Sequence, residues 1–188
     1  MNHSHFKLYK PARYLSQFIY EQKRKKKLLG ELYDFPKGTM AIGRLDENSE
    51  GLLLLTTDGK VSHYVLSQKV EKEYYAQVDG VISEDAILKL SKGVEIGFEG
   101  IKYITLPCPV SQIQNVPKFP PGWRIRDERH GPTSWISITL REGKFRQVRK
   151  MTAAVGFPTL RLVRVRVGNE HIDDMLPGDV IEVKDFHL

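Results

Sequence analysis

An uninterrupted run of large aliphatic residues, Leu52–Leu55, constrains the fold of this chain more than any other segment. Together with Thr56 it has the length of a strand, and a strand without polar alternation is typical of one that is buried on both faces. A polar, turn-rich loop, Asp46-Glu47-Asn48-Ser49-Glu50-Gly51, precedes it. We therefore expect an interior strand that begins directly after a polar loop.

Weaker patterns predict the remaining elements. Strands are expected over 6–9, 40–45, 73–78, 135–140, 160–167 and 180–183. Helical spacing predicts one helix through Val61, Tyr64 and Val65, a second between Ser83 and Gly93, and a third over Phe145–Val155. Residues 12–39 and the proline-marked stretch 107–121 are expected to be mostly irregular. Because several connections are too short for parallel crossovers, the expected class is α+β, with a mixed, largely antiparallel central sheet flanked by helices.

Size and composition favour one intracellular domain. A chain of 188 residues suits one domain over 1–188, with two α+β lobes and no room for a further domain before Phe6. The single cysteine, Cys108, excludes an internal disulfide and a multi-cysteine zinc site. No apolar run approaches the roughly 20 residues of a spanning helix, and the basic start has no apolar signal region. We expect a cytoplasmic protein that works as a monomer.

Positive charge is concentrated in one part of the chain. Residues 118–166 carry twelve Lys and Arg against three acidic residues, a net of +9, although the whole chain carries only +6. A basic segment inside a slightly acidic remainder is typical of a site for a polyanion. Nucleic acid is the partner that this distribution indicates.

Three segments could carry chemistry. Asp46 ends Gly43-Arg44-Leu45-Asp46, between two expected strands that would hold a carboxylate rigidly, although such an aspartate is more often a turn residue. After Gly143, the expected helix places Arg146, Arg149 and Lys150 on the face opposite Val148, Met151, Thr152 and Val155. In Lys72-Glu73-Tyr74-Tyr75 the two tyrosines point to opposite faces of a strand, so at most one lines a site.

Taken in this order, the three segments resemble the pseudouridine synthases of the family that modifies ribosomal RNA and includes the small-subunit type. The resemblance rests on GRLD followed by Ser49-x-Gly51-Leu-Leu-Leu-Leu-Thr, on Lys72-x-Tyr74, and on Glu142-Gly-Lys144-x-Arg146-Gln-Val-Arg149-Lys150-Met. The stretches Pro132–Trp135 and Met151–Leu162 are similar to the subgroup of large-subunit pseudouridine synthase E. That subgroup lacks the N-terminal S4-type RNA-binding domain of other members. Lys150 stands where an arginine is common, which keeps the charge but loses the forked geometry.

The resemblance implies a role for each site residue. Asp46 is the catalytic carboxylate that acts on a flipped uridine, through a sugar adduct or through a glycal. Tyr74 packs against the uracil ring, and Arg149 pairs with Asp46 and keeps it ionised. Arg44 helps fill the space left by the extruded base, while Lys144, Arg146 and Lys150 bind the RNA backbone. The implied substrate is ribosomal RNA of the large subunit.

The implied reaction requires no cofactor, because it rearranges uridine without oxidising it or transferring an outside group. The absence of a Gly-rich phosphate loop agrees with this. Two alternatives stay open. A non-catalytic RNA-binding protein accounts for the basic segment equally well but gives Asp46 no role. A metal-dependent nuclease could use Asp46, Glu47, Glu50 and Asp58, although their spacing matches no known ligand loop and we expect no metal site.

Overall fold

The computed structural model describes residues 3–19, 25–67, 70–115, 117–125 and 128–188, which form two compact units. The first unit consists of Met1–Val70 and Val163–Leu188, and the second of Glu71–Leu162. The second unit is thus inserted, in sequence, between the two parts of the first.

The first unit is built on a sheet in which β1, β3 and β9 carry the interior. Its strand order is β11-β1-β3-β9, with β2 paired to β3 and β10 paired to β9. The strands are β1 (His5–Lys10), β2 (Met40–Ala41), β3 (Glu50–Thr56), β9 (Thr159–Val167), β10 (Glu170–His171) and β11 (Val180–Val183), and β9 belongs to this unit from Val163 onward. The helices are α1 (Gly59–Ser67) and the 3-10 turn η1 (Leu29–Glu31).

Strand β3 is the buried strand that the aliphatic run predicts. Leu52–Leu55 are all at most 1% exposed, and β3 pairs with β1 on one side and with β9 on the other. The pairing with β1 is antiparallel and that with β9 is parallel. Because side chains alternate between the two faces of a strand, complete burial of four consecutive leucines means that both faces are covered.

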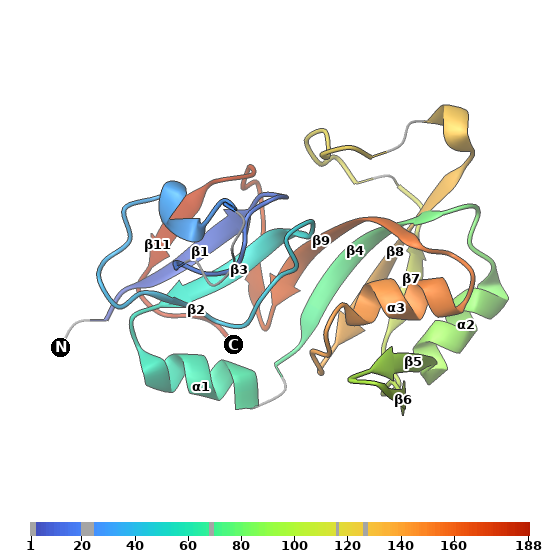
Figure 1. Ribbon diagram of the computed structural model, residues 1–188, viewed down its shortest axis with the longest axis horizontal. Helices are drawn as coiled ribbons and strands as arrows, with labels where there is room; N and C mark the ends of the chain where they lie inside the picture. The colour runs from blue at the N-terminus through green and yellow to red at the C-terminus, as the bar shows by residue number, and fades with distance from the viewer. Residues whose placement is uncertain (1–2, 20–24, 68–69, 116, 126–127) are drawn as a thin grey trace. The chain divides into compact units, whose positions relative to one another are not determined.

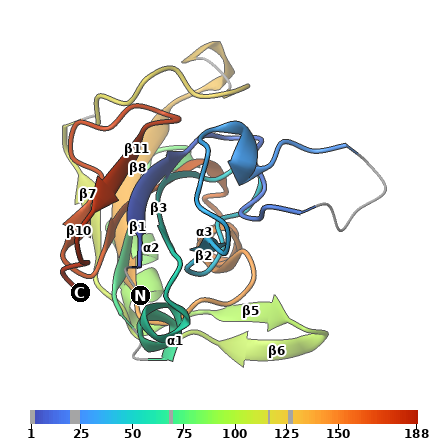
Figure 2. The same ribbon diagram turned by 90° about the vertical axis from the view of Figure 1, so that its left-hand side faces the viewer.

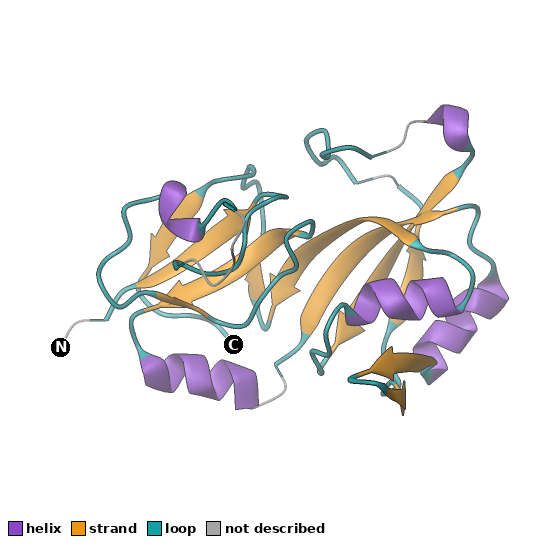
Figure 3. Cartoon of the chain, in the orientation of Figure 1, coloured by secondary structure: helices purple, strands orange, loops and turns teal. Residues whose placement is uncertain are grey.

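The second unit packs two helices on one face of an antiparallel sheet. Its strands are β4 (Lys72–Asp79), β8 (Thr133–Leu140), β7 (Val110–Ile113) and the hairpin of β5 (Glu95–Phe98) and β6 (Ile101–Ile104), drawn in Figure 2. The helices are α2 (Glu84–Lys92), α3 (Gln147–Ala154) and the 3-10 turn η2 (Glu128–His130), as coloured in Figure 3. Strand β8 lies between β4 and β7 and pairs with both in antiparallel register.

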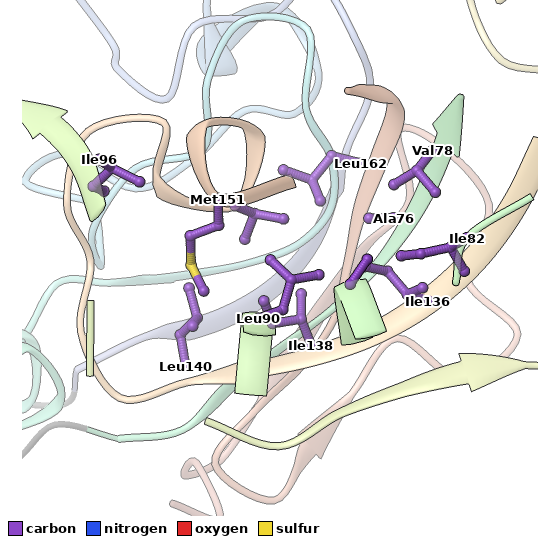
Figure 4. Close-up of a cluster of buried hydrophobic side chains, with 12 residues drawn as sticks. Ala76, Val78, Ile82, Leu90, Ile96, Ile136, Ile138, Leu140, Met151 and Leu162 are labelled. Carbon is purple, nitrogen blue, oxygen red and sulfur yellow. The ribbon is translucent and has the colours of Figure 1, made fainter. Parts of the chain in front are cut away.

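One apolar cluster holds this unit together (Figure 4). Leu90 of α2 and Met151 of α3 are both 0% exposed and pack on Ile136 and Ile138 of β8. Ser83 caps α2 as its sequence predicts, with its hydroxyl accepting a hydrogen bond from the Ala86 N–H at 3.2 Å. The cluster fixes α3, and with it the basic side chains that α3 carries.

The α+β class and the largely antiparallel sheet are confirmed, whereas three expected elements need correction. The strand expected over 40–45 ends at Ala41, because Gly43 has a φ of +73° and turns the chain. The stretch 107–121 is not wholly irregular, because it contains β7. The third helix begins at Gln147 rather than Phe145, because Arg146 is left-handed, with a φ of +52°.

Candidate active site

The Asp46 loop is anchored on its N-terminal side by a buried serine. Ser16 Oγ lies 2.9 Å from both the main-chain nitrogen and the carbonyl oxygen of Leu45, so it accepts a hydrogen bond from one and donates to the other. Leu45 and Ser16 are both buried, while Asp46 itself is half-buried. The residue before the candidate carboxylate therefore cannot shift without breaking two buried hydrogen bonds.

The other side of Asp46 is anchored through Glu47. The Glu47 carbonyl accepts hydrogen bonds from the Arg13 N–H at 2.7 Å and from Lys10 Nζ at 3.3 Å. Its carboxylate binds Lys26 Nζ at 2.8 and 2.9 Å. Both neighbours of Asp46 are thus held, Leu45 by Ser16 and Glu47 by Lys10, Arg13 and Lys26, so the aspartate is fixed from both sides.

Lys10 is a functional candidate that the sequence patterns do not reveal. Its side chain is completely buried, and Nζ donates to the carbonyls of Pro11 and Tyr14 at 2.8 and 2.7 Å as well as to Glu47. Burial lowers the pKa of Lys10 to about 7, although Glu50, Asp46 and Glu47 favour its charged form. Three acceptors around one amine suit the ammonium form, which has three donors. No sequence signal marks Lys10, because the burial of β1 along its whole length is apparent only in the structure.

Gly51 closes the loop against β9. Its φ is +104°, and a Cβ at this position would lie 2.3 Å from the carbonyl oxygen of Arg164. The buried Arg164 also donates from Nε to the Leu52 carbonyl at 2.7 Å. Only glycine permits this close approach of the two backbones, so packing explains why glycine occupies position 51.

The remaining site candidates lie in the second unit. Tyr74 on β4 is half-buried and packs against the apolar cluster, opposite Ile138 in the strand register. Tyr75 points to the other face, where its ring contacts Phe119. The prediction that the two tyrosines point to opposite faces of the strand is confirmed, and Tyr74 is on the face that α3 covers.

Helix α3 divides its basic residues differently from the prediction. Val148, Met151 and Thr152 are buried as expected. Arg149 is half-buried, and its Nη1 donates to the Thr159 carbonyl at 3.2 Å. Arg146 precedes the helix as its N-cap and is exposed, so it does not share a helical face with Arg149.

The structure therefore divides the seven expected site residues into two groups. Arg44 and Asp46 share one loop of the first unit, with Arg44 exposed. The other five belong to the second unit: Tyr74, Lys144, Arg146, Arg149 and Lys150. The pairing of Asp46 with Arg149, which belong to different units, stays a prediction.

Comparison with known proteins decides the family. The family model described as RNA pseudouridylate synthase matches residues 4–154. Over 179 residues the chain is 41% identical to the ribosomal large subunit pseudouridine synthase E of Vibrio parahaemolyticus serotype O3:K6, which covers 93% of this chain and 71% of that protein. The chain belongs to the RNA pseudouridylate synthase family.

Two further comparisons agree. This pseudouridine synthase is 39% identical over 173 residues to the ribosomal large subunit pseudouridine synthase E of Xanthomonas axonopodis pv. citri, covering 90% of this chain and 88% of that protein. A solved structure described as the crystal structure of pseudouridylate synthase superposes with a TM-score of 0.76 at 25% identity, over 96% of this chain and 70% of that one. The resemblance drawn from the three segments is confirmed, and the protein is an isomerase.

The acidic residues of this synthase include the four considered as metal ligands for the nuclease alternative. Among the described residues, no group of three or more His, Cys, Asp or Glu side chains could hold a metal ion. Glu47, one of the four ligands considered, is instead bound to Lys26.

No helix in the described part of the chain is long and apolar enough to cross a membrane.

Proposed function

We propose that this pseudouridine synthase isomerises one uridine of large-subunit ribosomal RNA, and that Asp46 is its catalytic carboxylate. The observation that carries the assignment of Asp46 is its double anchoring, through Ser16 on one side and through Lys10 and Lys26 on the other. A group that must meet a reacting carbon needs this kind of preorganisation. The names of the two relatives support ribosomal RNA as the substrate.

The reaction exchanges one glycosidic bond for another. The N1–C1′ bond breaks, the freed uracil turns, C5 bonds to C1′, and the proton on C5 is removed while N1 gains one. Asp46 acts either by attack on C1′ or by assisting departure of the base through a glycal. Because no electrons or outside groups enter, we expect the reaction to require neither a metal nor a cofactor.

Tyr74 and Arg149 complete the proposed machinery. The half-buried Tyr74 ring would retain the detached uracil, since a flipped base is commonly held against an aromatic wall. Arg149 would pair with Asp46, and a guanidinium within about 4–6 Å favours the ionised carboxylate. We propose that 1–188 acts as one catalytic domain, so that residues of both units serve the same reaction.

Four basic side chains are proposed to bind RNA. Arg44 would occupy the space left by the extruded base, and Lys144, Arg146 and Lys150 would contact phosphates. The support for the latter three is the net charge of +9 over 118–166 in a chain of total charge +6, whereas Arg44 is proposed because it is exposed on the loop of Asp46. As an enzyme of ribosomal RNA it would work in the cytoplasm, and we infer that a monomer suffices.

The test is pseudouridine formation by purified protein on ribosomal RNA that lacks the modification, in buffer with EDTA. Carbodiimide treatment and primer extension would locate each new pseudouridine. Wild type and Asp34→Asn, the same change at an exposed aspartate of the first unit, should give one stop in the large-subunit RNA. Asp46→Asn should give none while its affinity for the RNA stays within about threefold of wild type.

Other outcomes separate the alternatives. Tight RNA binding by all three proteins without any stop would favour a non-catalytic RNA-binding protein. Cleavage of the RNA in a parallel reaction with Mg²⁺ in place of EDTA, and none in EDTA, would favour the nuclease. A stop in small-subunit RNA would keep the enzyme and overturn the proposed substrate.

A further inference from the structure

An aromatic and a guanidinium side chain lie at the tip of a tight turn directly before α3. The turn is closed twice: the Gln147 N–H donates to the Lys144 carbonyl at 3.1 Å, and the Lys144 N–H donates to Gln147 Oε1 at 3.0 Å. Phe145 and Arg146 are its two central residues, and both are exposed. The main chain under these two side chains is therefore fixed.

A partly buried hydrogen-bond network supports this turn. Gln147 is 4% exposed, and its Nε2 donates to Glu142 Oε1 at 2.6 Å. The Glu142 carboxylate also accepts from the Tyr103 hydroxyl at 2.5 Å and from the Leu106 N–H at 2.9 Å. The turn thus rests on the β5–β6 hairpin region as well as on α3, and it is far more constrained than an ordinary surface loop.

The backbone of the turn is unfavourable for the residue that it contains. Arg146 has a φ of +52° and a ψ of +35°, a left-handed conformation that only glycine, asparagine and aspartate adopt readily. Strained residues of this kind gather where proteins contact ligands. A turn made only to connect β8 with α3 could carry glycine here.

The Phe145 side chain is largely exposed rather than packed against apolar neighbours. It is 66% exposed, and its contact partner is a cation, Lys150 Nζ, at 5.4 Å from the ring centroid. Lys150 Nζ also donates to the Gly97 carbonyl at 2.7 Å, which holds it beside the ring. Lys144 Nζ lies 4.9 Å from the centroid of Tyr103 on the same network. An isolated exposed phenylalanine is ordinary, but this one lies on a rigid turn, beside Lys150 and between Lys144 and Arg146 in sequence.

We infer that Phe145 is a stacking platform for an unpaired base of the RNA substrate, with Lys144, Arg146 and Lys150 binding the phosphates beside that base. Aromatic rings stack on single-stranded bases whatever their identity, while basic side chains follow the backbone. This inference rests on the proposed function, since it assumes an RNA substrate. It adds that the enzyme holds a nucleotide other than the flipped uridine, and that this nucleotide is unpaired.

The experiment compares Phe145→Ala with Phe145→Trp, and uses Leu88→Ala, which shortens an exposed apolar residue on α2 of the same unit, as a matched control. The first probe is a transcript of the large-subunit RNA region that wild type modifies, or of the whole large-subunit RNA if wild type modifies none. The second probe is a fully paired RNA of equal length. Stacking on one base is worth about 1–3 kcal/mol, which corresponds to a five- to 150-fold change in Kd.

Phe145→Ala should therefore weaken binding of the transcript at least fivefold, whereas Phe145→Trp and Leu88→Ala should bind it as wild type does. All four proteins should bind the paired RNA alike, and ultraviolet crosslinking should join the transcript to the peptide that contains Phe145. Equal melting temperatures confirm folding, and Phe145→Gln provides a polar replacement should the alanine variant melt early.

Equal affinity of Phe145→Ala and wild type for the transcript would overturn the inference, as would equal weakening on paired RNA. Pseudouridine formation by wild type is scored separately. If wild type forms no pseudouridine but Phe145→Ala still loses affinity, the proposed function fails and the stacking site stands. If wild type is active and Phe145→Ala is unchanged, only the stacking site fails.

Discussion

The buried ammonium group of Lys10 donates a hydrogen bond to the main-chain carbonyl of Glu47, with 3.3 Å between Nζ and O. Lys10 ends β1, and Glu47 follows the candidate catalytic aspartate. Lys10 also donates to two further carbonyls, and it thereby joins β1 to the Asp46 loop. Charges face it from Asp46, Glu47, Glu50 and Arg164, so this loop is electrostatically as well as sterically fixed.

Replacing Lys10 by methionine is expected to remove a pH dependence from the free energy of unfolding. Burial lowers the pKa of Lys10 to about 7 from 10.5. Between these values the unfolded chain binds more protons than the folded chain, so the contribution of Lys10 to the free energy of unfolding rises with pH. The rise from pH 7 to pH 9 should be about 2 kcal/mol.

Urea unfolding of both proteins at pH 7, 8 and 9 measures this. The difference in unfolding free energy, wild type minus Lys10→Met, should increase at each step. Lys37→Met, at an exposed lysine of the first unit, should show a constant difference. A constant difference for Lys10→Met as well would mean that the buried amine keeps an ordinary pKa.

Ser16→Ala should lower catalysis more than RNA affinity. The change leaves the main-chain N–H and carbonyl of Leu45 without the Ser16 hydroxyl, which costs about 1–3 kcal/mol of stability and loosens the residue before Asp46. We expect the single-turnover rate of pseudouridine formation to fall about tenfold or more, with Kd for RNA changed less than twofold. Ser67→Ala, which removes an exposed serine hydroxyl on α1, is the control. Equal loss of rate in both variants would contradict the positioning role.

Gly51→Ala is expected to destabilise the protein by about 3 kcal/mol or more, because the new Cβ would lie 2.3 Å from the Arg164 carbonyl oxygen at a φ of +104°. Gly59→Ala is the matched change, since a Cβ there meets nothing within 4 Å and alanine suits the start of α1. Thermal and urea unfolding would separate the two. Similar stabilities would show that β3 and β9 can move apart at this position.

Cys108 should react slowly with iodoacetamide in the native protein. Burial, and to a smaller extent the charge of Glu142, raise the pKa of this thiol from 9.0 to about 11, which lowers the thiolate fraction at pH 8 about 100-fold. The alkylation rate should rise to that of a model thiol in urea. Native and unfolded rates that agree would show that the thiol is neither buried nor opposed by the carboxylate.

The elements that the sequence predicts correctly are those whose own residues indicate a buried face or a helix cap. The four leucines of β3, the apolar residues of β8 and the Ser83 cap of α2 each have a local cause that the sequence shows. Strand β7 was missed because prolines surround it. It forms because it pairs with β8, and a local sequence pattern does not show such a contact. The β5–β6 hairpin was not predicted at all.

The candidate site shows the same division. The motifs predict Asp46, Tyr74 and Arg149 as site residues, and these stay predictions, whereas no motif points to the residues that hold the Asp46 loop. Ser16 acts over 29 residues and Lys10 over 37, so neither produces a recognisable spacing. The left-handed Arg146 was also unpredictable, because basic residues on a helical pattern favour a helix and only the Glu142–Gln147 network overrides that preference.

The insertion of one unit within the other has a consequence for how the protein is made. His5 pairs with Val183, so β1 cannot pair with β11 until residue 183 has left the ribosome. Glu71–Leu162 is continuous in sequence and has emerged by then. Since a unit folds once its own residues are available, the inserted half can mature during translation, and the half that carries Asp46 is the last to form. On the proposed assignments, the surface that carries Lys144, Arg146 and Lys150 would form before the loop that carries Asp46.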